Sequence, residues 1–358
     1  MRPQQPQEVS KPPLPFFGER VGHAPHPASP QRGEEVLTPQ LGLGIGWRPE
    51  LAWTIDRHAR GGPSPADSPS ATGVAYSRRP VIDFVEIIAE DFDPSEPLPP
   101  ALARLKERGL TIIPHGVSLS LGSAEPPSRK RLDHLASLAE RCDAPLVSEH
   151  IAFVRGGGHE TGHLLPVPRT REMLDILVEN IALAQAALGV PLALENIATM
   201  LEWPGGEMDD AEFLCELLRR TGVLLLLDLE NVYANCLNQG RDPHILEQSS
   251  NGARLETCPT LSRNPVDFLD RLPLERVAYV HVAGGFERHG LFHDTHTEPA
   301  PQAVFDLVSE LYARTDVPGV MLERDGHFPP EPELLAELSA IESAAWRGRS
   351  RREAFDAF

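Results

Sequence analysis

The sequence predicts an α/β protein that forms a single (β/α)8 barrel of the TIM-barrel type. Eight apolar runs of strand length occur between Leu41 and Gly326, and each is followed by a segment with helical spacing. Strands that alternate with helices pair in parallel, and eight such units over about 290 residues are enough to close a barrel. An open doubly wound sheet is the alternative, but its glycine-rich dinucleotide motif is missing from the sequence.

The predicted elements alternate regularly along the chain. Apolar residues recur every three or four positions in segments such as "SRKRLDHLASLAERC" and "TREMLDILVENIALAQAALG", which is the spacing of a helix with one buried face. In chain order, the eight strands are expected within residues 41–47, 81–90, 110–122, 145–153, 190–198, 223–232, 277–285 and 319–326.

The segments outside the predicted barrel domain, residues 39–345, differ from it in composition. Residues 1–38 are rich in Pro, Gln, Arg and Glu and bury too little apolar surface to offset chain entropy, so we expect a disordered tail. Residues 346–358 are expected to form a short charged C-terminal tail. Residues 60–73 are expected to be a surface loop, and residues 248–265 an insertion.

The composition restricts the class of partner and the compartment. The net charge of -19 argues against nucleic acid or an anionic membrane surface as the main partner, because both would repel the protein. Four widely spaced cysteines without a CxxC pair indicate reduced thiols. No apolar run approaches the ~20 residues that span a bilayer, and no signal peptide is apparent. We therefore expect a cytoplasmic protein.

Histidines and carboxylates come late in six consecutive predicted strands, the third to the eighth. The carboxyl ends of barrel strands open onto one mouth, so these side chains should meet in one pocket. In the loop after the seventh strand, "FHDTHTE" adds two residues that can both face inward if the segment is extended. The eight candidates are His115, His150, Glu195, Asp228, His281, Asp294, His296 and Glu323.

A group of buried ionisable side chains of this size points to metal. Each unpaired group would cost several kcal/mol to bury, and shared cations are the simplest way to satisfy all of them. Imidazole and carboxylate ligands without thiolate suit iron, manganese or zinc. Eight ligands exceed what one ion takes, so two or more ions bridged by a carboxylate are implied. Hydrolytic and oxidative use of the remaining positions stay open as alternatives.

Some polar residues near this group have simpler explanations. Glu149 must point to the opposite side of its strand from His150, so we expect it to be structural. Glu90 and Asp91 either lie beside the site or begin a helix, and Glu230 stays ambiguous. Seven histidines fall in tail, loop or helix contexts and are expected to be solvated: His23, His26, His58, His134, His159, His163 and His244.

An ordered set of short motifs is similar to one known family. The motifs are "PHGVSLSLGS", "SEHIAF", "ALENIA", "LLDLENVYANCLNQGRDP", "YVHVAGG", "DTHTEP" and "MLERDG". Together they resemble the multinuclear non-heme iron-dependent oxidative enzymes, formerly the domain of unknown function 692 (UPF0276-like) family, which includes the methanobactin biosynthesis iron enzyme. The resemblance covers nearly the whole predicted barrel, from about Leu41 to Ile341.

The resemblance implies a xylose-isomerase-like barrel with two or three non-heme irons. It implies an oxidoreductase that uses dioxygen to modify cysteine residues of a ribosomally synthesised precursor peptide, with a small peptide-recognition protein as a further partner. The matching motif positions are the same eight metal ligands. In this interpretation Asn196 and Arg324 orient substrate or ligands. The rival hypothesis is a redox-neutral divalent-metal barrel enzyme, such as a sugar isomerase or a phosphodiesterase.

Two positions depart from the family pattern. Many members read "AGH" where this chain has Ala283, Gly284 and Gly285, and "NHG" where it has Gln239 between an asparagine and a glycine. Both changes leave the eight predicted ligands intact. Together with the 248–265 insertion, they bear on the identity of the substrate more than on metal binding.

Overall fold

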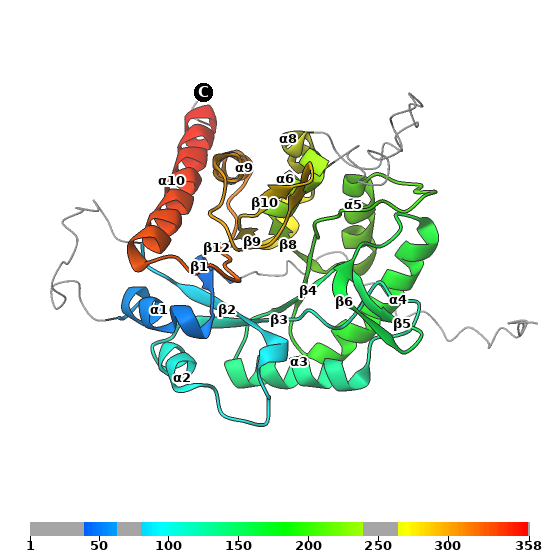
Figure 1. Cartoon of the computed structure of the whole chain (residues 1–358), viewed down its shortest axis with the longest axis horizontal. Coiled ribbons are helices and arrows are strands. Elements are labelled where there is room, and N and C mark those ends of the chain that lie inside the picture. The colour runs from blue at the N-terminus through cyan, green and yellow to red at the C-terminus, as the bar shows by residue number, and fades with distance from the viewer. Residues whose placement is uncertain (1–38, 63–79, 239–263, 357–358) are drawn as a thin grey trace, which may run out of the picture. The chain divides into compact units, whose positions relative to one another are not determined.

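Eight parallel strands close into a barrel (Figure 1), in the order β1-β12-β9-β8-β7-β4-β3-β2. The computed structural model describes residues 39–62, 80–238 and 264–356. Every barrel strand lies within one of the predicted runs, so the predicted (β/α)8 barrel is confirmed. The strands are β1 Gly42–Gly46, β2 Phe84–Ile88, β3 Thr111–His115, β4 Val147–His150, β7 Leu192–Glu195, β8 Leu224–Asp228, β9 Val277–Val282 and β12 Gly319–Leu322.

Helices follow the strands and begin and end at recognisable signals. The side chains of Thr170 and Asp209 accept hydrogen bonds from the first turns of α4 and α5. Gly189 and Gly222 end the same two helices in the left-handed conformation that glycine adopts without strain. The α-helices are α1 Ala52–His58, α2 Pro100–Glu107, α3 Arg129–Cys142, α4 Arg171–Leu188, α5 Asp210–Thr221, α6 Leu229–Asn238, α8 Pro265–Arg271, α9 Gln302–Arg314 and α10 Glu331–Asp356.

The barrel interior consists of an apolar layer with a layer of ionisable groups above it. Alternate strand residues face the same side, so on several strands an inward apolar residue is followed two positions later by an inward polar one. Ile113 precedes His115 in this way, and Leu226 precedes Asp228. The apolar layer is formed by Leu41, Phe84, Ile113, Leu146, Ala193, Leu224, Leu226, Ala278, Tyr279 and Met321. This layer separates the site from the lower end of the barrel.

Strand β1 carries a glycine, Gly44, that leaves room in this interior for a neighbouring side chain. A Cβ atom added to Gly44 would overlap the ring of Phe84, which is fully buried in the apolar layer. The ring packs edge-on against Tyr279, with centroids 6.0 Å apart. Glycine at position 44 therefore allows an aromatic side chain to fill the barrel axis.

Two hairpins interrupt the simple alternation of strands and helices, and the sequence did not predict them. The hairpin of β5 Phe153–Gly156 and β6 His159–Leu165 follows β4. The hairpin of β10 Phe286–Arg288 and β11 Leu291–His293 follows β9. Both leave the barrel at the carboxyl ends of its strands, where they extend the surroundings of the mouth.

The carboxyl-terminal segment differs from the expected organisation. The boundary expected at Trp346 does not interrupt α10, which continues to Asp356 and runs beside α9 (Figure 1). The expected disordered tail at 1–38 lies outside the described residues, as do almost all of the 248–265 insertion and most of the 60–73 loop. Among the described helices, none is both long and apolar enough to cross a membrane.

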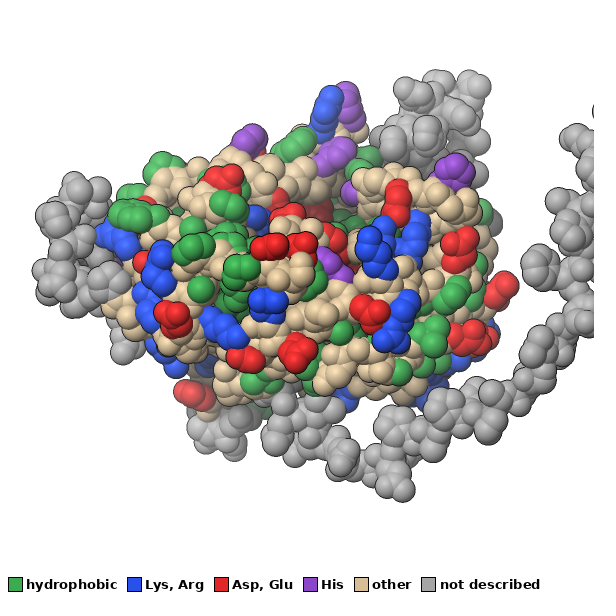
Figure 2. Space-filling view, turned by 90° about the horizontal axis from the view of Figure 1, so that it is seen from below, with side chains coloured by type: hydrophobic (Ala, Val, Ile, Leu, Met, Phe, Trp, Pro, Cys, Tyr) green, Lys and Arg blue, Asp and Glu red, His purple; other side chains and the backbone are tan. Residues whose placement is uncertain are grey.

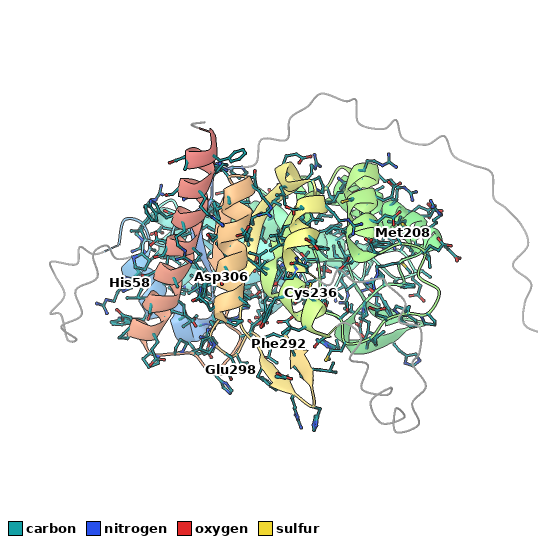
Figure 3. The ribbon with its side chains drawn as sticks, turned by 90° about the horizontal axis from the view of Figure 1, so that it is seen from above. His58, Met208, Cys236, Phe292, Glu298 and Asp306 are labelled. Atoms are coloured by element: carbon teal, nitrogen blue, oxygen red, sulfur yellow. The ribbon has the colours of Figure 1, made fainter. Side chains whose placement is uncertain are left out.

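One of the histidines expected to be solvated is buried. His58, at the end of α1, is shielded by the start of α10, where its Nε2 lies 2.9 Å from Oε1 of Glu331 (Figure 3). Arg57 binds the other oxygen of the same carboxylate at 2.9 Å. This double contact ties the first helix of the barrel to the last.

Replacing Gly44 with alanine is expected to destabilise the barrel, because the new methyl group would force the Phe84 ring to move. Overpacking of this kind costs about 1–3 kcal/mol, which denaturant unfolding would measure. The matched control is Gly156→Ala, since a Cβ there meets nothing within 4 Å. Its free energy of unfolding should stay within about 0.5 kcal/mol of the unmodified protein. Equal effects of the two changes would contradict this account of the interior.

Candidate metal centre

The eight predicted ligands meet at the carboxyl ends of the barrel strands. Each belongs to at least one group of three side chains whose ligand atoms lie within 4.8 Å of one another. Two further carboxylates, Glu86 and Glu230, complete these groups. The groups overlap: His115, His150 and Glu195; Glu195, Asp228 and His281; Glu86, His281 and Glu323; Asp228, His296 and Glu323; Glu230, Asp294 and His296.

The first position lies between β3, β4 and β7. Nε2 of His115 is 3.5 Å from Oε2 of Glu195, and Nε2 of His150 is 3.3 Å from the same oxygen. Neighbouring strands hold these residues in register, because His150 pairs with Glu195 and His115 pairs with Ser148. Three ligand atoms from three rigid strands therefore converge on one point.

The second position surrounds His281 on β9. Its Nδ1 lies 2.9 Å from Oε2 of Glu323, 3.6 Å from Oε1 of Glu195 and 3.8 Å from Oδ2 of Asp228. Glu195 thus presents one oxygen to the first position and the other to the second. A carboxylate placed in this way is suited to bridge two ions.

The third position is built largely from the loop after β11. Nε2 of His296 lies 2.6 Å from Oδ1 of Asp294 and 3.6 Å from Oε2 of Glu230. Nδ1 of His296 is 3.4 Å from Oε2 of Glu323, the oxygen that also faces His281. Glu323 therefore lies between the second and third positions with a single oxygen, whereas Glu195 presents a different oxygen to each of its two positions.

All four imidazoles share one arrangement, in which one ring nitrogen is held from outside and the other faces carboxylates. Nδ1 of His115 contacts Oγ of Ser148 at 2.8 Å, and Nδ1 of His150 contacts the Gly116 carbonyl at 3.1 Å. The outer partner of His281 is Glu86 at 3.0 Å, and that of His296 is Asp325 at 3.0 Å. Histidines that bind metal are typically oriented by such a bond to the second nitrogen.

Many of the inward-facing atoms have no hydrogen-bond partner among the described residues. Nε2 of His296 and Oδ1 of Asp294 are close, but they are not aligned as a hydrogen bond. Buried polar groups are normally satisfied, and a cation would satisfy these together. The residues therefore fit bound metal. The orphaned atoms are Glu86 Oε1, Glu195 Oε2, Asp228 Oδ2, both Glu230 carboxylate oxygens, His281 Nδ1, Asp294 Oδ1, His296 Nε2 and Glu323 Oε2.

Burial without a cation perturbs the acid and base chemistry of these groups. Desolvation, together with Glu195 and Asp294, raises the pKa of Asp228 well above its ordinary value. Desolvation and Asp294 raise the pKa of Glu230 to about 10. Desolvation and the neighbouring His150 lower the pKa of His115 to about 3. A neutral imidazole is the form that binds metal, and cations binding here would displace the protons held by the acids.

Of the two interpretations left open for Glu90 and Asp91, the structure supports the second, because both acids lie in the first turn of a short helix after β2. Glu90 and Asp91 are exposed in a short 3-10 turn, where the Glu90 carboxylate accepts the Val117 backbone N–H. Glu86, which was not selected, is buried and faces the centre. The signal was available in the alternation of β2, because Glu86 shares the parity of the inward Phe84. Glu149 lies on the other face of β4, as expected, and accepts the Leu119 N–H at 2.9 Å.

Asn196 and Arg324, predicted to orient substrate or ligands, both bind protein groups. The side-chain amide of Asn196 donates to the Asp228 carbonyl at 2.9 Å and accepts the Asp228 N–H at 3.0 Å, which fixes the backbone of a candidate ligand. Arg324 points away from the centre, toward Glu337 of α10 and the Thr297 carbonyl. It therefore supports the loop that carries His296.

Two other residues shape the mouth. Arg48, which follows β1, binds Asp325 and lies 3.6 Å from Oε1 of Glu323, so it brings a positive charge to this acidic region.

Gly285 stands where many family members carry histidine. A Cβ atom there would lie 2.9 Å from Oε1 of Glu230 and would overlap the His293 carbonyl. Gln239, the second departure from the family pattern, lies outside the described residues.

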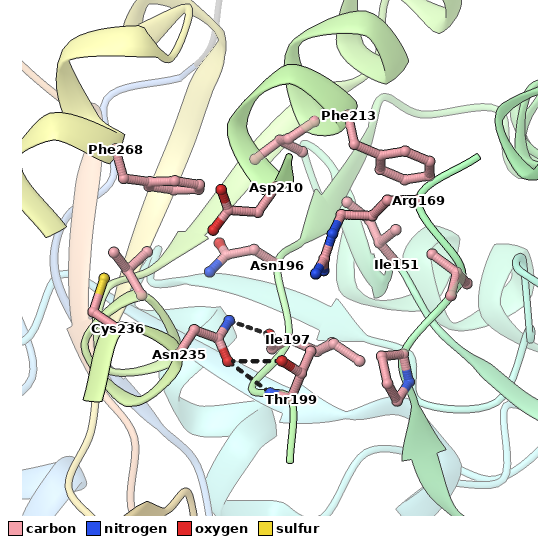
Figure 4. A pocket seen from close by; sticks show the side chains of 14 residues that line it. Ile151, Arg169, Asn196, Ile197, Thr199, Asp210, Phe213, Asn235, Cys236 and Phe268 are labelled. Atoms are coloured by element: carbon pink, nitrogen blue, oxygen red, sulfur yellow. Dashed lines mark hydrogen bonds between the residues drawn. The ribbon is translucent and has the colours of Figure 1, made fainter. Parts of the chain in front are cut away.

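A half-open cavity of about 80 Å³ lies beside the strand ends, between β7 and helices α5, α6 and α8 (Figure 4). Its wall is mainly apolar and includes Phe213 of α5 and Phe268 of α8. Asn235 closes one side by bonding Thr199 and the Ile197 carbonyl. On the surface shown in Figure 2, acidic side chains and histidine gather near the middle, with basic side chains around them.

Curated relatives are similar in sequence to this protein over most of its length. A UPF0276 protein of Streptomyces avermitilis is 47% identical over 318 residues, which make up 87% of this chain and 56% of that protein. A UPF0276 protein of Caulobacter vibrioides is 33% identical over 316 residues, covering 88% of this chain and 98% of that protein. The chain thus spans little more than half of the Streptomyces relative and nearly all of the Caulobacter one.

Solved structures with a similar chain path have low sequence identity. D-psicose 3-epimerase of Clostridium cellulolyticum H10 matches with a TM-score of 0.48 and 12% identity, over 86% of this chain and 99% of that one. A xylose isomerase domain protein of Planctomyces limnophilus matches with a TM-score of 0.43 and 12% identity, over 89% and 100%.

A protein-family match assigns this chain to a family. Residues 68–345 match the family described as RiPP precursor modification enzyme MbnB/TglH/ChrH. This range contains all eight predicted ligands together with Glu86 and Glu230. The resemblance inferred from the motifs is confirmed, and the chain belongs to the MbnB/TglH/ChrH family of RiPP precursor modification enzymes.

Proposed function

We propose that this protein is a multinuclear non-heme iron oxidase that uses dioxygen to modify cysteine residues of a ribosomally synthesised precursor peptide. Family membership supports a peptide substrate. The observation that carries the metal chemistry is the set of three linked positions, in which several buried imidazole and carboxylate atoms have no hydrogen-bond partner among the residues that the structure describes. We expect two or three irons, and a small partner protein that recognises the peptide.

The donor set supports iron as the metal. Ten buried or half-buried side chains supply only imidazole nitrogen and carboxylate oxygen, a combination found in non-heme iron sites. Bound iron would supply electron transfer to dioxygen and a position for the substrate thiolate. Glu195 and Glu323 would hold neighbouring ions together, since each faces two histidine positions.

The chain's own residues would keep this chemistry in place. Ser148, the Gly116 carbonyl, Glu86 and Asp325 fix the rotation of the four imidazoles. Asn196 fixes the strand end that carries Asp228. The apolar layer beneath excludes water from the lower side, so substrate must approach from the mouth.

Replacing His150 with alanine is expected to lower the iron content per chain, because the first position would lose one of its two imidazoles. Elemental analysis after anaerobic purification would measure the loss. The matched control is His159→Ala, which removes an exposed imidazole from the β5–β6 hairpin. Iron content equal to wild type in His150→Ala would show that the first position is assigned incorrectly.

A cysteine-containing peptide is expected to cause oxygen consumption by the iron-loaded protein. Oxygen uptake and the mass of the peptide would be recorded together, with a cysteine-containing candidate precursor peptide as substrate and its Cys→Ser form as the control. In this reaction dioxygen is reduced and the cysteine is oxidised. Uptake that is the same with both peptides would contradict cysteine as the reacting residue.

The rival hypothesis is a redox-neutral enzyme with two divalent ions, of the sugar isomerase or phosphodiesterase kind. The same purification distinguishes it from the oxidase. Stoichiometric zinc or manganese without iron, together with no oxygen uptake, would favour the rival and remove the basis for the oxidase.

A further inference from the structure

A continuous chain of buried polar contacts lies beneath the candidate metal centre. It begins at Nδ1 of His115, which contacts Oγ of Ser148 at 2.8 Å. The Tyr279 hydroxyl contacts the same Oγ at 2.6 Å and also binds Oε2 of Glu86. Oε2 of Glu86 contacts Nε2 of His281 at 3.0 Å. Two candidate ligands of different positions are therefore joined through three intermediate side chains.

This series of polar contacts crosses the barrel, and all of its side chains are buried from water. Its residues come from β2, β3, β4 and β9, and Tyr279 reaches from β9 to partners on β2 and β4. Ser148, Tyr279 and His281 have no exposed surface, Glu86 is 1% exposed and His115 is 2% exposed. Solvent therefore cannot replace a member that is removed, so each contact depends on the next.

The donor and acceptor groups of these side chains fix the direction of every hydrogen bond along the series of contacts. When Nδ1 of His281 binds metal it carries no proton, so the single proton of the neutral ring is on Nε2, which donates to Glu86. Tyr279 has a single hydroxyl proton, and the Glu86 carboxylate can only accept, so Tyr279 donates to Glu86. Ser148 is then free to donate to the Tyr279 oxygen and to accept from Nδ1 of His115. The unprotonated nitrogens of both histidines point into the centre.

We propose that Glu86, Tyr279 and Ser148 are positioning residues that hold His115 and His281 in the tautomers needed to bind metal and couple their two positions. This rests on the proposed metal centre and is independent of the peptide chemistry. Oε2 of Glu86, the oxygen that contacts His281, is already used by two donors. Through this oxygen Glu86 orients the histidine ligand His281, while its Oε1 has no hydrogen-bond partner among the described residues.

The test is ferrous iron binding under anaerobic conditions, without peptide or dioxygen. Tyr279→Phe should raise the iron dissociation constant about 10- to 100-fold, the usual effect of removing an outer partner of a metal ligand. The Mössbauer spectrum should also change, because the donor strength of both imidazoles changes. Tyr312→Phe is the matched control, since it removes a hydroxyl from a buried tyrosine of α9 that lies outside the site.

The double variant Ser148→Ala, Tyr279→Phe tests whether the members act as one chain. Since either change alone breaks the connection, the double variant should bind iron only about as weakly as the weaker single variant. Multiplied losses would overturn the coupling. Wild-type affinity and spectrum in Tyr279→Phe, with iron bound normally, would overturn the positioning role and leave the oxidase proposal standing. Loss of iron binding in wild type itself would instead remove the metal centre on which both proposals rest.

Discussion

Burial of imidazoles and carboxylates at one depth of the barrel is the constraint on which the rest of the structure depends. Strands end where the polar layer begins, and the apolar layer below it gives the polar groups no route to water. The inward atoms of Glu195, His281 and Glu323 lie close without forming aligned hydrogen bonds. Such an arrangement is stabilised by positive charge between the groups, which bound metal or a protonated imidazole would supply.

The positions are linked by shared carboxylates. Glu195 spans the first and second positions, and Glu323 spans the second and third. Loss of one shared carboxylate would therefore affect two ions together. The outer partners differ in chemistry, from the neutral Ser148 to the charged Glu86 and Asp325. The four imidazoles should accordingly differ in donor strength.

Much of the fold and of the site could be predicted from the sequence, because both follow from strand periodicity. Six of the eight candidate ligands lie at strand ends, where an aliphatic run becomes polar within a residue. Glu86 was missed because it lies inside its apolar run and not at the polar end of the strand. Glu230 was ambiguous because α6 begins directly after β8, and parity rules for strands do not carry into a helix.

Structural features that depend on contacts between distant residues could not be predicted from the local sequence. The β5–β6 and β10–β11 hairpins are short, and their sequences resemble ordinary loops. The continuation of α10 beyond Trp346 follows from its packing on α9, which composition does not reveal. The burial of His58 likewise requires Glu331 of α10, a partner far away in the sequence.

The backbone at His296 differs from the backbone that carries the other ligands of the centre. Its φ of 52° lies in the left-handed region, which is uncommon for a side chain of this size, and the residue sits on a loop that Asp325 and Arg324 secure. His115, His150 and Glu195 are instead carried by paired strands. Backbone pairing alone fixes the strand-borne ligands, whereas the placement of His296 depends on the side chains of Asp325 and Arg324, so a change at either of these two residues would reach one end of the centre and spare the other.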